Sequence, residues 1–258
     1  MTSSLSPAVA DSEHRVAFIT GSGARRIGRA VAELFAGHGY ALVLHANSSV
    51  EEAEAAVAQF QKSGTPALLV QGDVADEANV RSWIEAIVAR FGRLDVLVNS
   101  AAVWVRKPLE DVTAHDVREH FDVNTLGTFL CCKYVGLQMV RQPTGGAIVN
   151  LGDWATRRPY PDYSAYFPSK GAIPTLTRMF AVELARRNPR VRVNAVLPGP
   201  AMLPTNLPQA ERDQAVAATL VGREGSPENV AQAVLSLVDN EFITGVCLPV
   251  DGGRTVAS

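Results

Sequence analysis

A tyrosine and a lysine, Tyr166 and Lys170, stand four residues apart at the start of a segment with helical periodicity. A helix would place both side chains on one face. A phenol has a pKa of roughly 10 and is a poor acid–base group at neutral pH, but a neighbouring ammonium stabilises the phenolate and lowers that pKa. Such a tyrosine can transfer a proton while a nicotinamide transfers hydride. An exposed helical pair without chemistry is the alternative interpretation.

Two further polar residues belong to the same candidate catalytic group. Asp153 precedes Tyr166 by 13 residues and follows an apolar run, and strand ends of this kind face the ligand crevice of an open α/β sheet. A turn or helix-cap role is the alternative for this Asp. Asn124 interrupts a helical pattern, where an asparagine can bond a distorted backbone or a water, or lie at the surface.

A glycine-rich turn comes between the first apolar run and an amphipathic segment, and reads Thr20-Gly21-Ser22-Gly23-Ala24-Arg25-Arg26-Ile27-Gly28. Glycine lets the backbone approach a pyrophosphate, and a helix N-terminus supplies unpaired N–H groups. Arg25 or Arg26 adds charge-assisted hydrogen bonds. This position favours a dinucleotide site over an ordinary βα turn, with Gly21, Arg26, Ile27 and Gly28 as candidate cofactor contacts.

The segment after the second apolar run indicates which cofactor is bound. An Asp or Glu there binds the ribose hydroxyls of NAD and repels a 2′-phosphate. This chain has Leu44-His45-Ala46-Asn47-Ser48-Ser49 and no acid before Glu51. The neutral, donor-rich segment predicts NADP(H), with contacts from His45, Asn47, Ser48 and Ser49. A polar loop that does not discriminate is the alternative.

Short apolar runs and helical patterns alternate along the chain, which predicts an α/β fold with a doubly wound parallel sheet of the Rossmann type. The runs are nearly continuous in Val, Leu and Ile, as buried parallel strands require. We expect a flexible polar tail over 1–14, a single catalytic domain over 15–258 and a substrate lid near 199–222. The expected strands are 15–20, 40–45, 66–71, 94–99, 146–151, 191–197 and 246–250, and the longest helical regions are 113–141 and 163–187.

Composition excludes several classes of protein. With 258 residues, 47% hydrophobic and 19% charged, the chain can bury a large core, so disorder is not its main state. A net charge of −2 argues against nucleic-acid binding. No apolar run is long enough for a membrane helix, and the start lacks the pattern of a secretory signal. Three cysteines make no disulfide framework, which favours the cytoplasm, and the five histidines have no metal-ligand spacing.

Taken together, these motifs resemble the short-chain dehydrogenase/reductase family from about Arg15 to Arg254. The resemblance implies that Asp73 and Val74 hold the adenine, and that Lys170 bonds the nicotinamide ribose while Asn124 anchors a water relay behind it. It also implies a homotetramer formed through the two long helical regions. The further family positions that carry the resemblance, and that it assigns to the cofactor site, are Asn99, Ser100, Ala101, Pro198 and Gly199.

Two departures from the usual family pattern look like its pteridine reductase branch. Arg26 stands where most members have Gly, and Asp153 stands where most have Ser. In that branch an aromatic residue after the fourth strand stacks the pterin on the nicotinamide, and Trp104 occupies this place; Tyr163 matches a substrate-side aromatic. The resemblance implies an NADP-dependent reductase of a pterin-like C=N substrate, with Arg26 touching both cofactor and pterin.

Two other hypotheses remain. A reductase of ketone or 3-oxoacyl substrates is common in the family, although it is expected to carry Ser at position 153. A cofactor-binding sensor or scaffold without catalysis is expected to lose Tyr166 or Lys170, and both are present. In either enzyme hypothesis the partner is a small-molecule substrate, with no nucleic acid and no membrane.

Overall fold

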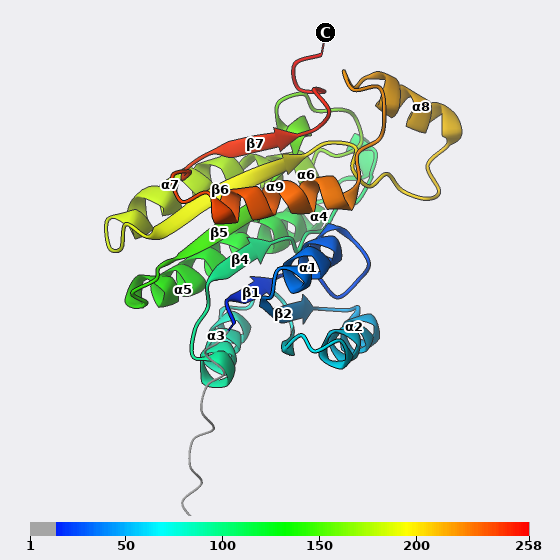
Figure 1. Cartoon of the computed structure of the whole chain (residues 1–258). Helices are drawn as coiled ribbons and strands as arrows, with labels where there is room; N and C mark the ends of the chain where they lie inside the picture. The colour runs from blue at the N-terminus through cyan, green and yellow to red at the C-terminus, as the bar shows by residue number, and fades with distance from the viewer. Residues whose placement is uncertain (1–13, 258) are drawn as a thin grey trace, which may run out of the picture.

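The computed structural model describes residues 14–257, so the tail expected over 1–14 lies, apart from His14, outside the described residues. A seven-stranded sheet runs through the molecule in the order β3-β2-β1-β4-β5-β6-β7 (Figure 1). All neighbouring strands are parallel, which confirms the predicted doubly wound sheet. The strands are β1 Val16–Ile19, β2 Ala41–Ala46, β3 Ala67–Gln71, β4 Val96–Asn99, β5 Gly146–Leu151, β6 Val191–Pro198 and β7 Cys247–Val250.

Helices cover both faces of the sheet (Figure 1), because the central strands are buried on both sides and need apolar cover. Every residue of β1, β2, β4 and β6 is buried. One core cluster packs α3 Glu77–Phe91, α5 Thr128–Arg141 and α7 Ile173–Ala185 on the sheet. The other packs α1 Ile27–Gly37, α2 Val50–Lys62 and α9 Pro227–Asp239 on the opposite face.

The two long helical regions of the sequence are each divided. Region 113–141 contains α4 Ala114–His120, a π-helical turn Phe121–Gly127 and α5. Gly127 packs against the third βα loop so tightly that a Cβ there would lie 2.5 Å from Val74 Cγ2. Region 163–187 contains α6 Tyr166–Gly171 and α7, and Pro174 in the first turn of α7 has no N–H to continue the earlier helix.

The stretch 199–222 contains a helix that the sequence did not predict, α8 Gln209–Ala217. It follows β6 and stands beyond the carboxyl ends of the strands, to one side of the main body (Figure 1). None of the helices described over residues 14–257 is long and apolar enough to cross a membrane.

Candidate active site

A cavity of about 860 Å³ opens at the carboxyl ends of the strands. Its walls come from the turn after β1, from the ends of β2 and β3, and from the loops after β4, β5 and β6. In a doubly wound sheet this edge is where ligands bind. The stretch predicted as a lid contributes Met202, Leu203, Leu207 and Gln214 to the wall.

Tyr166, Asp153 and Lys170 meet at one side of this cavity. The Tyr166 hydroxyl, at the first position of α6, donates a hydrogen bond of 2.9 Å to Asp153 Oδ2. Asp153 follows β5, and its other oxygen, Oδ1, accepts a bond of 2.7 Å from the N–H of Ala155. Lys170, one turn along α6, donates from Nζ to the carbonyl of Leu151 at 2.8 Å. All three line the cavity, so the end of β5 and the start of α6 position one site.

The charges at this site differ from the expectation drawn from the Tyr–Lys spacing. Burial and the Asp153 carboxylate raise the pKa of Tyr166 well above its usual value. Burial also raises the pKa of Asp153 and lowers the pKa of Lys170 to about 8. The expected lowering of the Tyr166 pKa is therefore wrong for this structure, because the phenol bonds the acid directly while the ammonium bonds a backbone carbonyl. The arrangement favours a protonated phenol, which can donate a proton.

Asn124 lies behind the site and does not line the cavity. Its side chain is fully buried in the π-helical turn. The amide oxygen accepts from the N–H of Val103 at 2.9 Å, and the amide nitrogen donates to the Val103 carbonyl at 3.0 Å and to Ser169 Oγ at 2.9 Å. Asn124 therefore fixes the loop after β4 against α6, the helix that carries Tyr166 and Lys170.

The turn after β1 packs closely against the loop after β4. Gly21 has φ of 64°, and a Cβ there would lie 2.7 Å from Ala101 Cα, so only glycine fits. The side chain of Arg29 braces the turn by donating to the carbonyls of Ser22 at 3.0 Å and Gly23 at 2.5 Å. The N–H groups of Ile27 and Gly28, in the first turn of α1, have no partner within the helix. They remain available to an anion.

His45 holds this turn from the second strand. The N–H of Gly21 donates to His45 Nδ1 at 2.9 Å, and His45 Nε2 bonds the carbonyl of Gly72 at 2.9 Å. Nδ1 must accept and Nε2 must donate, so the ring is neutral. Burial lowers the pKa of His45, which agrees with a neutral ring. His45 lines the cavity, and its hydrogen bonds connect the turn after β1 to the end of β3.

Most of the cofactor contacts expected from the sequence line the cavity, and two do not. Gly28 lies inside the turn, where a Cβ would meet the Gly21 carbonyl oxygen at 2.9 Å. The Asn99 amide points into the sheet and donates to Asn150 Oδ1 at 2.9 Å and Cys132 Sγ at 3.3 Å. The expected contacts that line the cavity are Gly21, Arg26, Ile27, His45, Asn47, Ser48, Ser49, Asp73, Val74, Ser100, Ala101, Tyr166, Lys170, Pro198 and Gly199.

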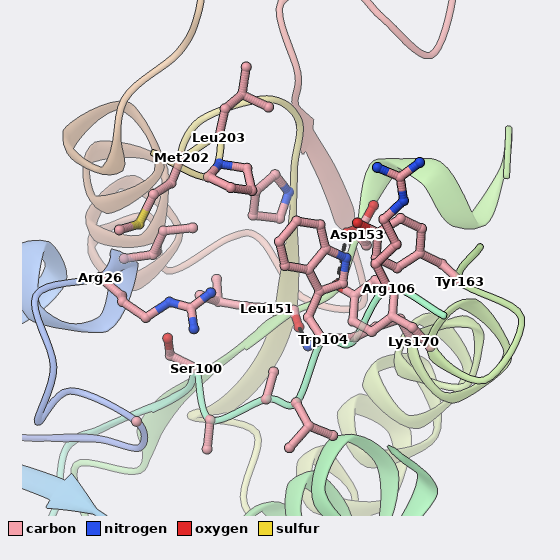
Figure 2. A pocket seen from close by; sticks show the side chains of 18 of the residues that line it. Arg26, Ser100, Trp104, Arg106, Leu151, Asp153, Tyr163, Lys170, Met202 and Leu203 are labelled. Carbon is pink, nitrogen blue, oxygen red and sulfur yellow. Dashed lines mark hydrogen bonds between the residues drawn. The ribbon is translucent and has the colours of Figure 1, made fainter. Parts of the chain in front are cut away.

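An aromatic wall forms the other half of the cavity. The rings of Trp104 and Tyr163 stack with centroids 5.1 Å apart and an angle of 7° between their planes. Figure 2 shows Trp104 between Arg26 on one side and Tyr163 and Arg106 on the other, with Met202 and Leu203 at the rim. Arg106 bonds Asp162 Oδ2 at 3.1 Å and reaches Glu211 of α8 at 3.6 Å. Trp104 and Tyr163, which the sequence predicts on the substrate side, both line the cavity.

Sequence reasoning missed several residues of this wall. Tyr160 and Arg106 line the cavity from irregular loops whose path the sequence does not specify. Arg254 lines it from beyond β7, and the available signal was its position directly after the Asp251-Gly252-Gly253 turn at the carboxyl edge of the last strand. Within the described part of the chain no group of His, Cys, Asp and Glu residues could hold a metal ion.

Comparison with known proteins defines the class of protein to which this fold and site belong. Residues 22–255 match the family model described as "Enoyl-(Acyl carrier protein) reductase". The chain belongs to the short-chain dehydrogenase/reductase family, whose dehydrogenases use nicotinamide cofactors, and it is an oxidoreductase of that family.

Individual relatives align over almost the whole chain. A 2,5-dichloro-2,5-cyclohexadiene-1,4-diol dehydrogenase of Sphingobium indicum is 34% identical, covering 96% of this chain and 99% of the relative. Carbonyl reductase family member 4 of Xenopus tropicalis is 35% identical, covering 90% and 94%. The crystal structure of acetoin dehydrogenase from Enterobacter cloacae superposes with a TM-score of 0.83 at 33% identity, covering 95% of this chain and 96% of that one.

Proposed function

We propose that this protein is an NADP(H)-dependent oxidoreductase that interconverts a carbonyl compound and its alcohol. The observation that carries the proposal is the hydrogen bond from Tyr166 to Asp153, one helical turn from Lys170, in a cavity that also contains the phosphate turn. The relatives named above are a diol dehydrogenase, a carbonyl reductase and an acetoin dehydrogenase by name. These names favour a carbonyl or alcohol substrate.

The residues of the cavity fit a nicotinamide dinucleotide. Glycine at 21 and 28 lets the turn pack closely, since a Cβ there would clash with Ala101 Cα or with the Gly21 carbonyl oxygen. This packing leaves the first N–H groups of α1 unpaired at the cavity. When bound, that cofactor supplies the hydride. Tyr166 donates its phenolic proton to the substrate oxygen. Asp153 orients the phenol, and Lys170, held on the Leu151 carbonyl, keeps a positive charge near the pair.

The preference for NADP(H) rests on the segment that follows β2. Asn47, Ser48 and Ser49 line the cavity without a carboxylate among them, and Arg26 stands at the start of α1. A neutral segment of donors accommodates a 2′-phosphate that an acid would repel. We expect a higher kcat/KM with NADPH than with NADH.

Asn47→Asp tests this preference with a change of charge at constant shape. The variant is expected to lower kcat/KM for NADPH by about tenfold or more, because a carboxylate there repels the 2′-phosphate and accepts from the ribose of NADH instead. Asn47→Ala is the matched control: it removes the amide without adding a charge, so it should lower kcat/KM for NADPH less than Asn47→Asp does and should not improve the use of NADH. Equal use of both cofactors by the wild type would contradict the proposal.

The reaction itself is tested by following NADPH oxidation with a panel of ketones and diketones, and NADP⁺ reduction with the matching alcohols. Turnover with any of them supports the proposal. Tight NADPH binding without hydride transfer to the whole panel would instead support the sensor or scaffold hypothesis.

A pterin-like substrate is the second candidate. It is favoured by Asp153 bonded to Tyr166, and by the stacked Trp104 and Tyr163, since a planar heterocycle packs well on aromatic rings. NADPH oxidation with dihydrobiopterin or biopterin separates the two candidates. Turnover of pterins but of no ketone would favour the second.

We also propose a homotetramer assembled through the helices after β4 and β5. Large apolar side chains are exposed on these elements, namely Val117, Phe121, Leu126, Leu137 and Val182. Contact between protomers through these helices would remove the five side chains from water. Light scattering on the purified protein measures the mass in solution, and a monomer would contradict this assembly.

A further inference from the structure

Arg254 brings a guanidinium group to the substrate half of the cavity. It follows the tight turn after β7 and lines the cavity together with Tyr160 and Ala215. Its guanidinium lies 4.6 Å from the centre of the Trp154 ring, and Nη1 donates to the carbonyl of Ala215 in α8 at 2.5 Å. Stacking and this hydrogen bond hold the group in place between the loop after β5 and α8.

The other cations that line the cavity already have partners or roles. Arg106 lies between the carboxylates of Asp162 and Glu211. Lys170 lies beside the Tyr166–Asp153 pair, and Arg26 stands at the phosphate turn. Arg254 therefore remains as the cation of the substrate half without an assigned partner.

Within residues 14–257, Arg254 makes no ion pair with a carboxylate. Asp251, the acid nearest to it in sequence, accepts from the N–H groups of Gly253 at 2.9 Å and Thr255 at 2.7 Å and from the Thr255 hydroxyl at 2.5 Å. The Asp251 carboxylate therefore accepts hydrogen bonds within the turn and does not pair with Arg254. The Nε and Nη2 groups of Arg254 have no partner in the described part of the chain.

A row of aromatic rings leads from Arg254 to the catalytic tyrosine. Trp154, beneath the guanidinium, stacks on Tyr160 at 6.4 Å between centroids. Tyr160 meets Tyr163 edge-on at 5.2 Å, and Tyr163 stacks on Trp104. Trp104 in turn meets Tyr166 at 6.5 Å. An apolar body that lies along this row would have one end at the phenol and the other at the guanidinium.

We propose that Arg254 binds a carboxylate of the substrate, so that the substrate is an oxo acid with an apolar body between its carbonyl and carboxylate groups. A guanidinium with two free donor positions matches a carboxylate in a bidentate geometry. Partial removal from water strengthens this attraction relative to an exposed pair. The inference rests on the proposed function, since it assigns the carbonyl end of the substrate to Tyr166.

The experiment compares acids with their neutral esters. A series of aryl oxo acids of increasing chain length, each paired with its methyl ester, is assayed with NADPH, and the binding of each to the NADP⁺-loaded protein is measured by calorimetry. Wild type, Arg254→Gln and Arg254→Lys are compared. Arg157→Gln is the matched control, because Arg157 is exposed on the loop after β5 and does not line the cavity.

We expect at least one acid to be bound and reduced in preference to its ester. Arg254→Gln should lower kcat/KM and affinity for that acid by about tenfold or more while leaving the ester nearly unchanged. Arg254→Lys should recover part of the loss, and Arg157→Gln should behave as wild type.

Two results would overturn the inference. The inference would be overturned if the wild type reduced acids and their esters with equal kcat/KM and bound them with equal affinity. The proposed function would be unaffected by that result, since turnover would be present. Failure of every acid to bind the loaded protein would also overturn it. Preferential binding of acids that depends on Arg254 but gives no turnover would support the inference and count against carbonyl reduction as the function.

Discussion

At Tyr166, burial and the neighbouring Asp153 carboxylate raise the pKa of the phenol. Asp153 touches the hydroxyl at 2.9 Å, whereas Lys170 donates to the Leu151 carbonyl. The spacing of Tyr166 and Lys170 predicted their shared helix, and the order of motifs predicted that Asp153 lies nearby. The sequence could not predict which of the two charges is closer to the phenol, because that depends on side-chain directions in the loop after β5.

Removing the phenolic hydroxyl should abolish proton transfer without disturbing the cofactor. Tyr166→Phe is expected to lower kcat by about 100-fold or more, the usual contribution of a positioned acid–base group. The Kd for NADPH, measured by fluorescence, should stay close to that of the wild type. Tyr160→Phe removes a phenol from the same wall and should retain most activity. An unchanged kcat in Tyr166→Phe would remove this residue from the mechanism.

The pH dependence of reduction should depend on Asp153. Its carboxylate raises the pKa of Tyr166, so a neutral amide at this place lowers that pKa. Reduction needs the protonated phenol, and its alkaline decline should therefore begin at lower pH in Asp153→Asn than in the wild type. A kcat/KM profile for reduction measures this shift.

Asp162→Asn is the control for that profile, since it removes another carboxylate of the cavity, one paired with Arg106. It should leave the alkaline limb where it is in the wild type. If the alkaline decline of kcat/KM in Asp153→Asn moved to higher pH or did not move, Asp153 would not be the residue that raises the pKa of Tyr166.

Among the elements, the strands agreed with the sequence to within a residue or two, because each is a short, mainly apolar run with a clear boundary in the sequence. The helices that frame the site agreed less well. Asn124 bonds Val103 and Ser169 across the fold and lies in a π-helical turn within region 113–141. The sequence marked Asn124 as an unusual residue within a helical pattern, but the contacts that accompany the distortion come from residues distant in the chain and cannot be predicted from local periodicity.

The link between β2 and the phosphate turn should make stability depend on pH through His45. The native state holds this ring neutral and burial lowers its pKa, while the unfolded chain takes up a proton at about pH 6.5. The unfolded state thus binds more protons below that pH. Between the folded pKa and about 6.5 this group should lower the free energy of unfolding by about 1.4 kcal/mol for each pH unit of acidification.

His45→Gln provides the comparison, because glutamine cannot titrate. Urea unfolding at a series of pH values should show a shallower acid decline in the variant than in the wild type. Parallel declines would mean that His45 does not contribute to the loss of stability in acid.

For the whole molecule, one cavity collects residues from the loops that follow β1 to β6 and from the chain beyond β7. Parallel strands make this possible, since all their carboxyl ends meet at one edge. The alternation of elements was therefore enough to predict the edge of the sheet at which the cavity lies. Of the aromatic row, the sequence indicated Trp104 and Tyr163 but not Trp154 and Tyr160. The meeting of these rings with Arg254 could not be predicted, because it depends on how irregular segments fold over one another.

A ligand that bridges so many segments should stabilise the whole fold. NADPH at about 100 times its Kd is expected to add about 2.7 kcal/mol to the free energy of unfolding. In a domain of this size that corresponds to a rise in Tm of roughly 5–10 °C. Differential scanning fluorimetry with NADPH and NADH at equal concentration measures it, and a larger rise with NADH would contradict the assigned cofactor preference.

Cys132, whose sulfur meets the amide of Asn99 beneath the site, has Cys131 as its neighbour, and both thiols are fully buried. Burial raises the pKa of Cys131 to about 12, so neither an alkylating reagent nor a peroxide finds a thiolate there while β4 and β5 stay covered by α5. Cys247 is half-buried on β7, so we expect it to react first. The rate at which Cys131 and Cys132 are labelled, compared with the rate for Cys247, should therefore measure how often the centre of the sheet opens.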